Sequence, residues 1–233
     1  MSRIFCPNCN RPENACICAF TADIANDIHV VVLQHPSEVS HTKGTVALLA
    51  KSLRKCQVIV GESFDSDNCF SKVLTKYQPV LLYPGQQANI LNNNSLATLI
   101  NLEFTIDEVN EKSKPLCLVI LDGTWKKAYR MFMLSTKLQQ LSQVCLPEYL
   151  ANAGQYQIRK VAKKNALSSL EASCYALALL EHNDLLAPDG SADFHINTNK
   201  VSPENAGKYQ PLLEKFKQFN QFQLSFRPEH KTL

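Results

Sequence analysis

Residues 116–125 read Leu-Cys-Leu-Val-Ile-Leu-Asp-Gly-Thr-Trp, a continuous apolar run followed by a polar turn and the only tryptophan of the chain. Because residues 116–121 show no alternation of polar and apolar side chains, they predict a strand that is covered on both faces. Residues 125–134 follow as a predicted helix with Ala128, Met131 and Phe132 on one face. A strand, a turn and a helix in this order are typical of a parallel α/β sheet.

The same pattern continues on both sides of this unit. We predict further strands over 28–33, 57–60, 79–83 and 144–146, and helices over 45–54 and 168–182. The second of these helices opens with Ser168 and Glu171 in the spacing of a capping box, and a last helix is expected to begin near Ser202-Pro203. The predicted fold is therefore α/β, with a mostly parallel sheet flanked by helices.

The composition of the chain supports a globular fold. Its 233 residues are 45% hydrophobic and 19% charged, which predicts a substantial core and excludes a disordered chain. The longest apolar run is far shorter than the roughly 18 residues that cross a membrane, so we expect no membrane segment. The N-terminal sequence MSRIFCPNCN lacks the apolar stretch of a secretory signal, which leads us to expect a cytoplasmic protein.

Four of the nine cysteines lie close together near the N-terminus, as Cys6-x2-Cys9 and Cys16-x-Cys18. Four thiolates satisfy the tetrahedral coordination of zinc, and a closed site of this kind has a structural role. The alternative is four reduced cysteines on an unfolded terminus, where they would be open to oxidation. We predict that residues 1–24 form a small zinc-binding module with these four cysteines as ligands.

Basic residues gather in one part of the chain, although the net charge is only +3. Residues 126–164 hold eight basic residues and one acidic residue, Glu148, which suits a phosphate-rich partner. The solvated faces of surface helices would produce the same cluster. The basic residues are Lys126, Lys127, Arg130, Lys137, Arg159, Lys160, Lys163 and Lys164.

The turn after the 116–121 strand lies where α/β sheets bind their ligands, at the carboxyl end of a strand. Asp122 in this turn either caps the following helix or takes part in catalysis, and the residues alone do not decide between the two roles. Trp125 is consistent with stacking on a base and, more simply, with a place in the core behind the turn. Pro84-Gly85 ends another predicted strand in the same manner.

A second polar loop follows the 28–33 strand and contains His35, Glu38 and His41. Two histidines and a glutamate are possible metal ligands in type, but no helical spacing brings the three side chains together. Contact with the substrate, or fixing of the loop, is the interpretation that we adopt for them.

Several of these motifs occur in the order found in the DTW-domain family, which is named for an Asp-x-Thr-Trp motif. The match runs from about the first cysteine to about His182 and includes Cys6…Cys9…Cys16…Cys18, His35-Pro-Ser-Glu38, Tyr83-Pro-Gly85, Asp122-Gly-Thr-Trp125 with Ala128, Arg159-Lys160 and Leu170-Glu171-Ala172. The chain resembles the bacterial tRNA-uridine aminocarboxypropyltransferases of this family.

This resemblance implies an activity and a fold. The activity is transfer of the 3-amino-3-carboxypropyl group of S-adenosylmethionine to N3 of a tRNA uridine, U47 of the variable loop in tRNA numbering, with release of methylthioadenosine. The implied fold is SPOUT-like with a C-terminal trefoil knot. We accordingly expect three parts: the zinc module over 1–24, a SPOUT-like catalytic domain over 25–200, and a C-terminal helix over 201–233 packed on the sheet domain.

The resemblance also implies roles for individual residues. The implied catalytic residues are Asp122, Thr124 and Trp125. The implied cofactor-binding residues are Tyr83, Pro84, Gly85, Leu121, Asp122, Gly123, Ile158, Ser169, Leu170 and Glu171. The implied RNA-binding residues are His35, Glu38, His41, Lys126, Lys127, Arg159, Lys160, Lys163 and Lys164. Two positions depart from the family pattern, because Gly44 stands where Asn is expected and Ser169 replaces Thr.

Two other functions stay open on the sequence. A SPOUT-like fold also suits an RNA methyltransferase that uses the same cofactor, and the mass added to tRNA would distinguish the two. A non-catalytic zinc-ribbon protein would instead bind RNA without any dependence on S-adenosylmethionine. We expect tRNA as the partner, S-adenosylmethionine as co-substrate and zinc as a structural ion, with no membrane contact and no obligate protein partner.

Overall fold

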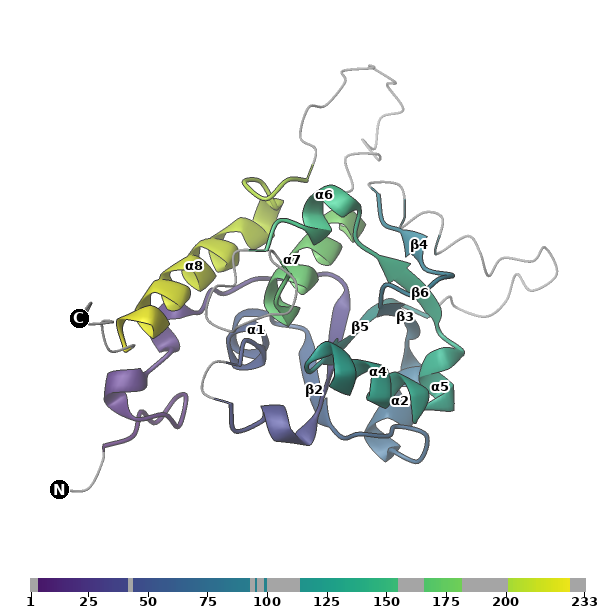
Figure 1. Cartoon of the computed structure of the whole chain (residues 1–233), viewed down its shortest axis with the longest axis horizontal. Helices are drawn as coiled ribbons and strands as arrows, with labels where there is room; N and C mark the ends of the chain where they lie inside the picture. Colours follow the sequence, from purple (N-terminus) through teal and green to yellow (C-terminus); the bar gives the residue numbers. More distant parts are fainter. Residues whose placement is uncertain are drawn as a thin grey trace, which may run out of the picture.

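The computed structural model describes residues 4–41, 44–92, 95, 99, 114–154, 166–181 and 201–226. Within these residues, six strands form one sheet in the order β2-β1-β5-β3-β6-β4, and every neighbouring pair is parallel. The strands are β1 (His29–Gln34), β2 (Cys56–Val60), β3 (Gln78–Leu82), β4 (Asn89–Ile90), β5 (Leu116–Asp122) and β6 (Ser142–Cys145) (Figure 1). The predicted parallel α/β sheet is confirmed.

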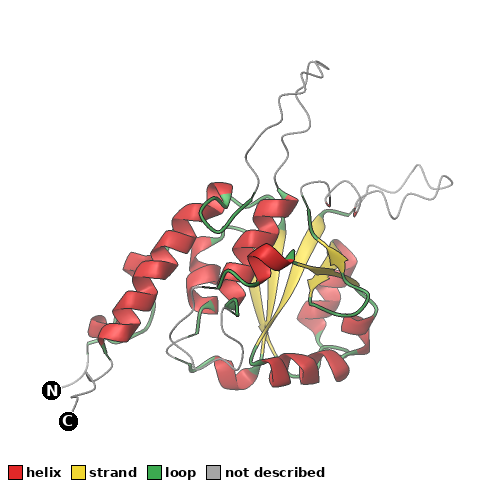
Figure 2. Ribbon diagram, turned by 45° about the horizontal axis from the view of Figure 1, so that its top comes forward, coloured by secondary structure: helices red, strands yellow, loops and turns green. Residues whose placement is uncertain are grey.

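Helices cover both faces of this sheet (Figure 2). One face carries α1 (Val46–Ser52) and α7 (Ser169–Leu180), with α8 (Gln210–Ser225) packed on the outside of α7. The other face carries α2 (Asn68–Lys76), α4 (Trp125–Met133) and α5 (Thr136–Gln139). A short helix, α6 (Glu148–Ala151), follows β6. The described helices include none that is both long and apolar enough to cross a membrane.

The two cores explain why the strands are continuous apolar runs. In β1, Val30 and Val32 face α1 and α7, whereas Val31 and Leu33 face α2 and α4. All four side chains are fully buried. Since both sides of each central strand are covered, a polar residue at either position would lose its hydration, and the sequence has no alternation here.

The last helix begins later than the sequence predicts. Ser202 accepts backbone N–H bonds from Glu204 and Asn205, so it closes a tight turn rather than capping a helix. α8 begins at Gln210, and its early proline is Pro211. The expectation of a helix start at Ser202-Pro203 is wrong, because a serine with a following proline is equally suited to a turn.

The segment that contains the four cysteines packs against the C-terminal helix. Phe20 contacts Phe219 and Phe222 of α8, with ring centroids 5.8 and 5.1 Å apart. Ile24 pairs with Leu53 after α1 in an isolated parallel bridge. The two ends of the described chain therefore lie side by side beyond α7, as Figure 1 shows.

Candidate active site and metal centre

A cavity of about 640 Å³ opens at the carboxyl ends of β3, β5 and β6. The first residues of α4 and α7 close it, and Thr45 contributes from the start of α1. A volume of this size suits a cofactor-sized ligand, and the carboxyl edge of a parallel sheet is the usual place for one. The predicted site residues at its wall are Tyr83, Pro84, Leu121, Asp122, Gly123, Thr124, Trp125, Lys126 and Ser169.

Asp122 is the buried carboxylate of this cavity. Its Oδ2 accepts a hydrogen bond from Gln34 Nε2 at 2.9 Å, and its Oδ1 accepts one from Ser169 Oγ at 2.6 Å. Two segments distant in sequence, the end of β1 and the start of α7, therefore hold its orientation. The cap of α4 is Thr124, whose side chain accepts from the backbone N–H of Lys127. The capping alternative for Asp122 is thus excluded, and Thr124 has the capping role.

Trp125 lies on the surface rather than in the core. It is 59% exposed, and part of its side chain lines the cavity. The core interpretation of this tryptophan is wrong, because the buried face of α4 is formed by Ala128 and Met131. Trp125 is the first residue of α4, and its side chain is not on the face of the helix that packs against the sheet.

Three predicted cofactor residues do not line the cavity. Leu170 is fully buried in the core beneath α7. Glu171 forms a capping box with Ser168, in which its carboxylate accepts from the Ser168 backbone N–H and hydroxyl. Gly85 lies against the side chain of Gln143, where a Cβ atom would clash. A fourth predicted residue, Ile158, lies outside the described residues.

The second polar loop is connected to α4 by charged contacts. The imidazole of His35 accepts the Ser37 backbone N–H at Nδ1, and its Nε2 lies 3.0 Å from Glu62 Oε1. Glu38 is buried and pairs with Lys127 Nζ at 2.8 Å. His35, Glu38 and Lys127 were predicted to bind RNA. In the structure their side chains make the contacts that hold this loop.

The remaining predicted RNA contacts differ in their placement. Lys126 and His41 are exposed, and Lys126 lies at the cavity wall. Arg130 and Lys137 of the basic stretch contact Glu62 and Ser71, respectively. Arg159, Lys160, Lys163 and Lys164 lie outside the described residues.

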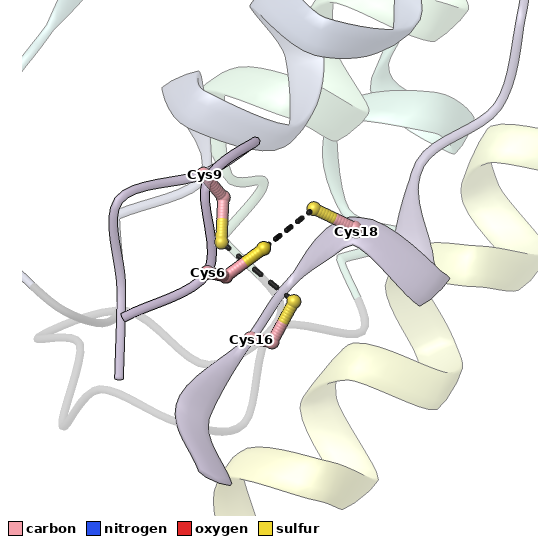
Figure 3. Close-up of side chains that lie close together, drawn as sticks. All are labelled: Cys6, Cys9, Cys16 and Cys18. Atoms are coloured by element: carbon pink, nitrogen blue, oxygen red, sulfur yellow. Dashed lines mark hydrogen bonds between the residues drawn. The ribbon is translucent and has the colours of Figure 1, made fainter. Parts of the chain in front are cut away.

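The four N-terminal cysteines bring their sulfur atoms together, as Figure 3 shows. Cys6 Sγ lies 3.8 Å from Cys18 Sγ, and Cys9 Sγ lies 3.7 Å from Cys16 Sγ. All four sulfurs are within 4.8 Å of one another. A tetrahedral zinc site with zinc–sulfur distances of about 2.3 Å has sulfur–sulfur edges of about 3.8 Å. The cluster can therefore hold a metal ion.

The backbone around the first cysteine pair favours thiolates. The backbone N–H groups of Cys9 and Asn8 point at the Cys6 sulfur and lower the pKa of that thiol. Burial opposes ionisation of Cys9, but N–H groups of Ile17 and Arg11 outweigh it and lower the pKa of its thiol to about 6. Metal binding needs the deprotonated form, and Cys6 and Cys9 are the two thiols of the cluster that ionise most readily.

Neither Gln34 nor Thr45 was singled out as a site residue from the sequence. Gln34 holds Asp122, and Thr45 is a buried polar residue of the cavity wall. The available signal for Gln34 was only its position at the end of an apolar strand, whereas its place opposite Asp122 follows from the register of β1 and β5 in the structure.

Comparison with known proteins gives one family and several relatives. The family described as DTW domain matches residues 3–224. A tRNA-uridine aminocarboxypropyltransferase 2 of Macaca fascicularis is 32% identical over 187 residues, which cover 78% of this chain and 58% of the relative. The protein of the same name from Drosophila melanogaster is 29% identical, with coverage of 76% and 66%.

A tRNA-uridine aminocarboxypropyltransferase A of Arabidopsis thaliana is 29% identical over 138 residues, which cover 57% of this chain and 52% of the relative. The chain thus spans between about half and two thirds of the length of these curated relatives. No solved structure matches it.

Proposed function

The chain belongs to the DTW domain family, and from this premise we propose that it transfers the 3-amino-3-carboxypropyl group of S-adenosylmethionine to N3 of a tRNA uridine. The observation that carries the proposal is the position of Asp122. This residue begins the Asp-x-Thr-Trp motif and is the buried carboxylate of a cavity large enough for the cofactor.

The reaction is a displacement at the methylene carbon bonded to the sulfonium. The N3 lone pair forms the new carbon–nitrogen bond, the carbon–sulfur bond breaks, and its electron pair stays on sulfur in methylthioadenosine. Uridine N3 carries a proton at neutral pH, so the enzyme must accept or orient that proton during attack. It must also present this methylene, rather than the methyl group, to the base.

Asp122 is placed to take the N3 proton. Gln34 and Ser169 each occupy one of its oxygens, which fixes the plane of the carboxylate and leaves further lone pairs directed to the cavity. Ser169 replaces the threonine of the family pattern, and both residues carry the hydroxyl that makes this bond. The departure at position 169 is therefore compatible with the same chemistry.

The cavity offers the cofactor two kinds of surface, the N-termini of two helices and an apolar wall. The N-termini of α4 and α7 adjoin the cavity, and the positive ends of their dipoles favour the carboxylate of the aminocarboxypropyl group. The apolar wall, formed by Leu82, Leu121, Leu146 and Leu167, suits the adenine and the methylthio group. Together they support Tyr83, Pro84, Leu121, Gly123 and Ser169 as cofactor-binding residues.

We propose zinc for the cysteine cluster. The sulfur–sulfur distances of 3.7 and 3.8 Å match the edges of a thiolate tetrahedron around this ion. A four-sulfur site has no open position for a substrate, so its contribution is to fold residues 4–20 and to hold Phe20 against α8.

Several finer assignments belong to the same proposal. Uridine 47 of the variable loop is the proposed target, and the basic stretch from Lys126 onward, apart from Lys137, is proposed to contact the tRNA. We also propose the knotted SPOUT-like arrangement that the family resemblance implies. Buried thiols at Cys117 and Cys174 suit a reducing compartment, for which we propose the cytoplasm.

Nucleoside mass spectrometry tests the function. Purified protein is incubated with S-adenosylmethionine and an unmodified tRNA transcript, and a transcript with cytidine at position 47 is the matched control. We expect aminocarboxypropyluridine and methylthioadenosine in equal amounts with the first transcript and neither with the second. Methylated uridine would identify a methyltransferase, and RNA binding without any product would identify a non-catalytic RNA-binding protein.

A further inference from the structure

Helix α4 carries an unusual outward face. Trp125, Tyr129 and Met133 are 59%, 58% and 52% exposed, and their spacing of four residues places them along one ridge. Lys126 and Arg130 occupy the corresponding positions of the adjacent ridge. The face therefore presents a row of large flat or flexible side chains beside a row of cations.

This exposure is not a consequence of how α4 packs. The helix buries Ala128 and Met131 against the sheet. These inward contacts hold α4 in place, and the outer ridge takes no part in them. Scattered exposed apolar side chains are ordinary, but a contiguous row of them marks an interaction surface. The ridge therefore suggests a partner.

The charge around the ridge favours a polyanion. The sequence has no Asp or Glu from 123 to 147, while it has four basic residues over α4 and α5. Arg130 stays 67% exposed although Glu62 lies 3.4 Å away, so a phosphate can compete for its guanidinium. Aromatic side chains next to cations are how proteins bind single-stranded nucleic acid.

The ridge is continuous with the cavity. Trp125 belongs to both, and it lies three residues after Asp122. Successive ridge residues are about 6 Å apart along the helix axis, more than the roughly 3.4 Å between stacked bases, so the ridge fits splayed rather than helical nucleotides. A nucleotide beside one held at Asp122 would meet Trp125 first and Tyr129 next.

We propose that the outward face of α4 is a stacking platform for the unpaired nucleotides that flank the target uridine, with Tyr129 and Met133 contacting bases and Lys126 and Arg130 contacting phosphates. The identity of the RNA rests on the proposed function, but the platform itself rests on the exposed ridge. Stacking is tolerant of sequence, so the platform contributes affinity and positioning rather than base selection.

The test uses Tyr129→Ala and Tyr129→Phe in the full chain, with Phe226→Ala as a control. Phe226 is an aromatic residue of similar exposure that directly follows the last residue of α8. Helix α8 lies away from α4 (Figure 1). Binding is measured with an unmodified tRNA transcript and with a short oligouridylate. Since Trp125 is the only tryptophan, its fluorescence reports directly on this face.

We expect Tyr129→Ala to weaken tRNA binding about 5- to 150-fold, the range for loss of one base-stacking aromatic. Tyr129→Phe, which keeps the ring, and Phe226→Ala should bind as the unaltered protein does. Oligouridylate should quench the Trp125 fluorescence. Calorimetry with S-adenosylmethionine should give equal affinities for all variants, which shows that the site behind the ridge is intact.

The platform would be overturned if Tyr129→Ala bound tRNA as tightly as the unaltered protein and oligouridylate did not change the Trp125 fluorescence. A dimer that dissociates on Tyr129→Ala, with tRNA affinity unaltered, would overturn it as well and assign the face to a second copy of the chain. If the unaltered protein binds RNA through α4 yet forms no aminocarboxypropyluridine, the platform stands and the proposed function fails.

Discussion

The cysteine cluster and the Asp122 cavity are built in opposite ways. The four sulfurs come from two adjacent tight segments, and short-range backbone bonds such as Asn10 N–H to the Cys6 carbonyl set their geometry. The cavity draws its walls from segments between Thr45 and Ala172, which the sheet brings together. Its key carboxylate is held by partners 88 and 47 residues away.

This difference predicts different responses to mutation. A local metal site should fail as a unit, because each ligand is needed and none can be replaced from elsewhere. A site assembled over long range should lose function when its reacting group changes, while the scaffold around it persists. The four predictions below test this contrast.

The largest effect is expected in the cysteine cluster. Cys6→Ser or Cys18→Ser should reduce the zinc content from about one equivalent to near zero, because a four-thiolate site has no spare ligand. Metal analysis of the purified variants gives the measurement. Cys69→Ser is the matched control, since Cys69 is an exposed thiol outside the cluster. Full zinc content in both ligand variants would contradict the proposed metal site.

Asp122→Asn should reduce turnover about 10²- to 10⁴-fold, the range for loss of a positioned general base. The oxygen of the new amide can still accept from Ser169, and its NH2 group can donate to the Gln34 amide oxygen once that amide turns over. The thermal midpoint and S-adenosylmethionine affinity should therefore be close to those of the unaltered protein. Raising the pH should recover part of the loss, because uridine N3 then ionises without help.

Turnover is followed by nucleoside mass spectrometry over a pH series. A variant with near wild-type rate at neutral pH would show that Asp122 has no role in proton transfer, and His35 would become the first residue to examine. A loss of S-adenosylmethionine binding would instead assign Asp122 to the cofactor.

A third prediction concerns a long-range contact at the opposite end of α7 from Ser169. Glu181 accepts the backbone N–H groups of Asp27 and Ile28 and pairs with Lys208 and Tyr209. Burial, together with this carboxylate, raises the pKa of Tyr209, so its phenol stays a donor. The contact fastens β1, α7 and the start of α8 to one another.

Glu181→Gln should lower the free energy of unfolding by about 2 kcal/mol, since hydrogen bonds to charged groups contribute roughly 1.5–3 kcal/mol. Denaturant titration measures the change. Glu214→Gln, on the exposed side of α8, should stay within about 0.5 kcal/mol of the unaltered protein. Equal effects of the two substitutions would contradict the proposed importance of the Glu181 contact.

The smallest effect is expected at the mouth of the cavity. Lys126→Ala should flatten the salt dependence of tRNA binding by about one unit of slope, the value for one lost phosphate contact. Lys137→Ala should leave the slope as it is, because the Lys137 ammonium donates to Ser71 and lies beyond α4. An unaltered slope in Lys126→Ala would show that this lysine is a solvated surface residue without a phosphate contact.

The sequence allowed prediction of much of the sheet but only part of the site. Four predicted strands lie within one residue of β1, β2, β3 and β5, and the fifth begins two residues after the start of β6. The agreement is close because a buried parallel strand must be continuously apolar. Helix α2 was not predicted, although Asp67 caps it through the Phe70 N–H at 2.7 Å. The start of α8 was misplaced, since serine followed by proline opens turns and helices alike.

By itself the sequence determined the features that depend on near neighbours. These are the apolar strands, the capping box at Ser168 and the cysteine cluster, whose spacing already limits how far apart the sulfurs can lie. Only the tertiary structure decided that Asp122 is bound by Gln34 and Ser169 while Thr124 caps α4. It also decided that Trp125 faces outward. The physical reason is that a side chain's partner across the sheet depends on strand order and register, which no local spacing encodes.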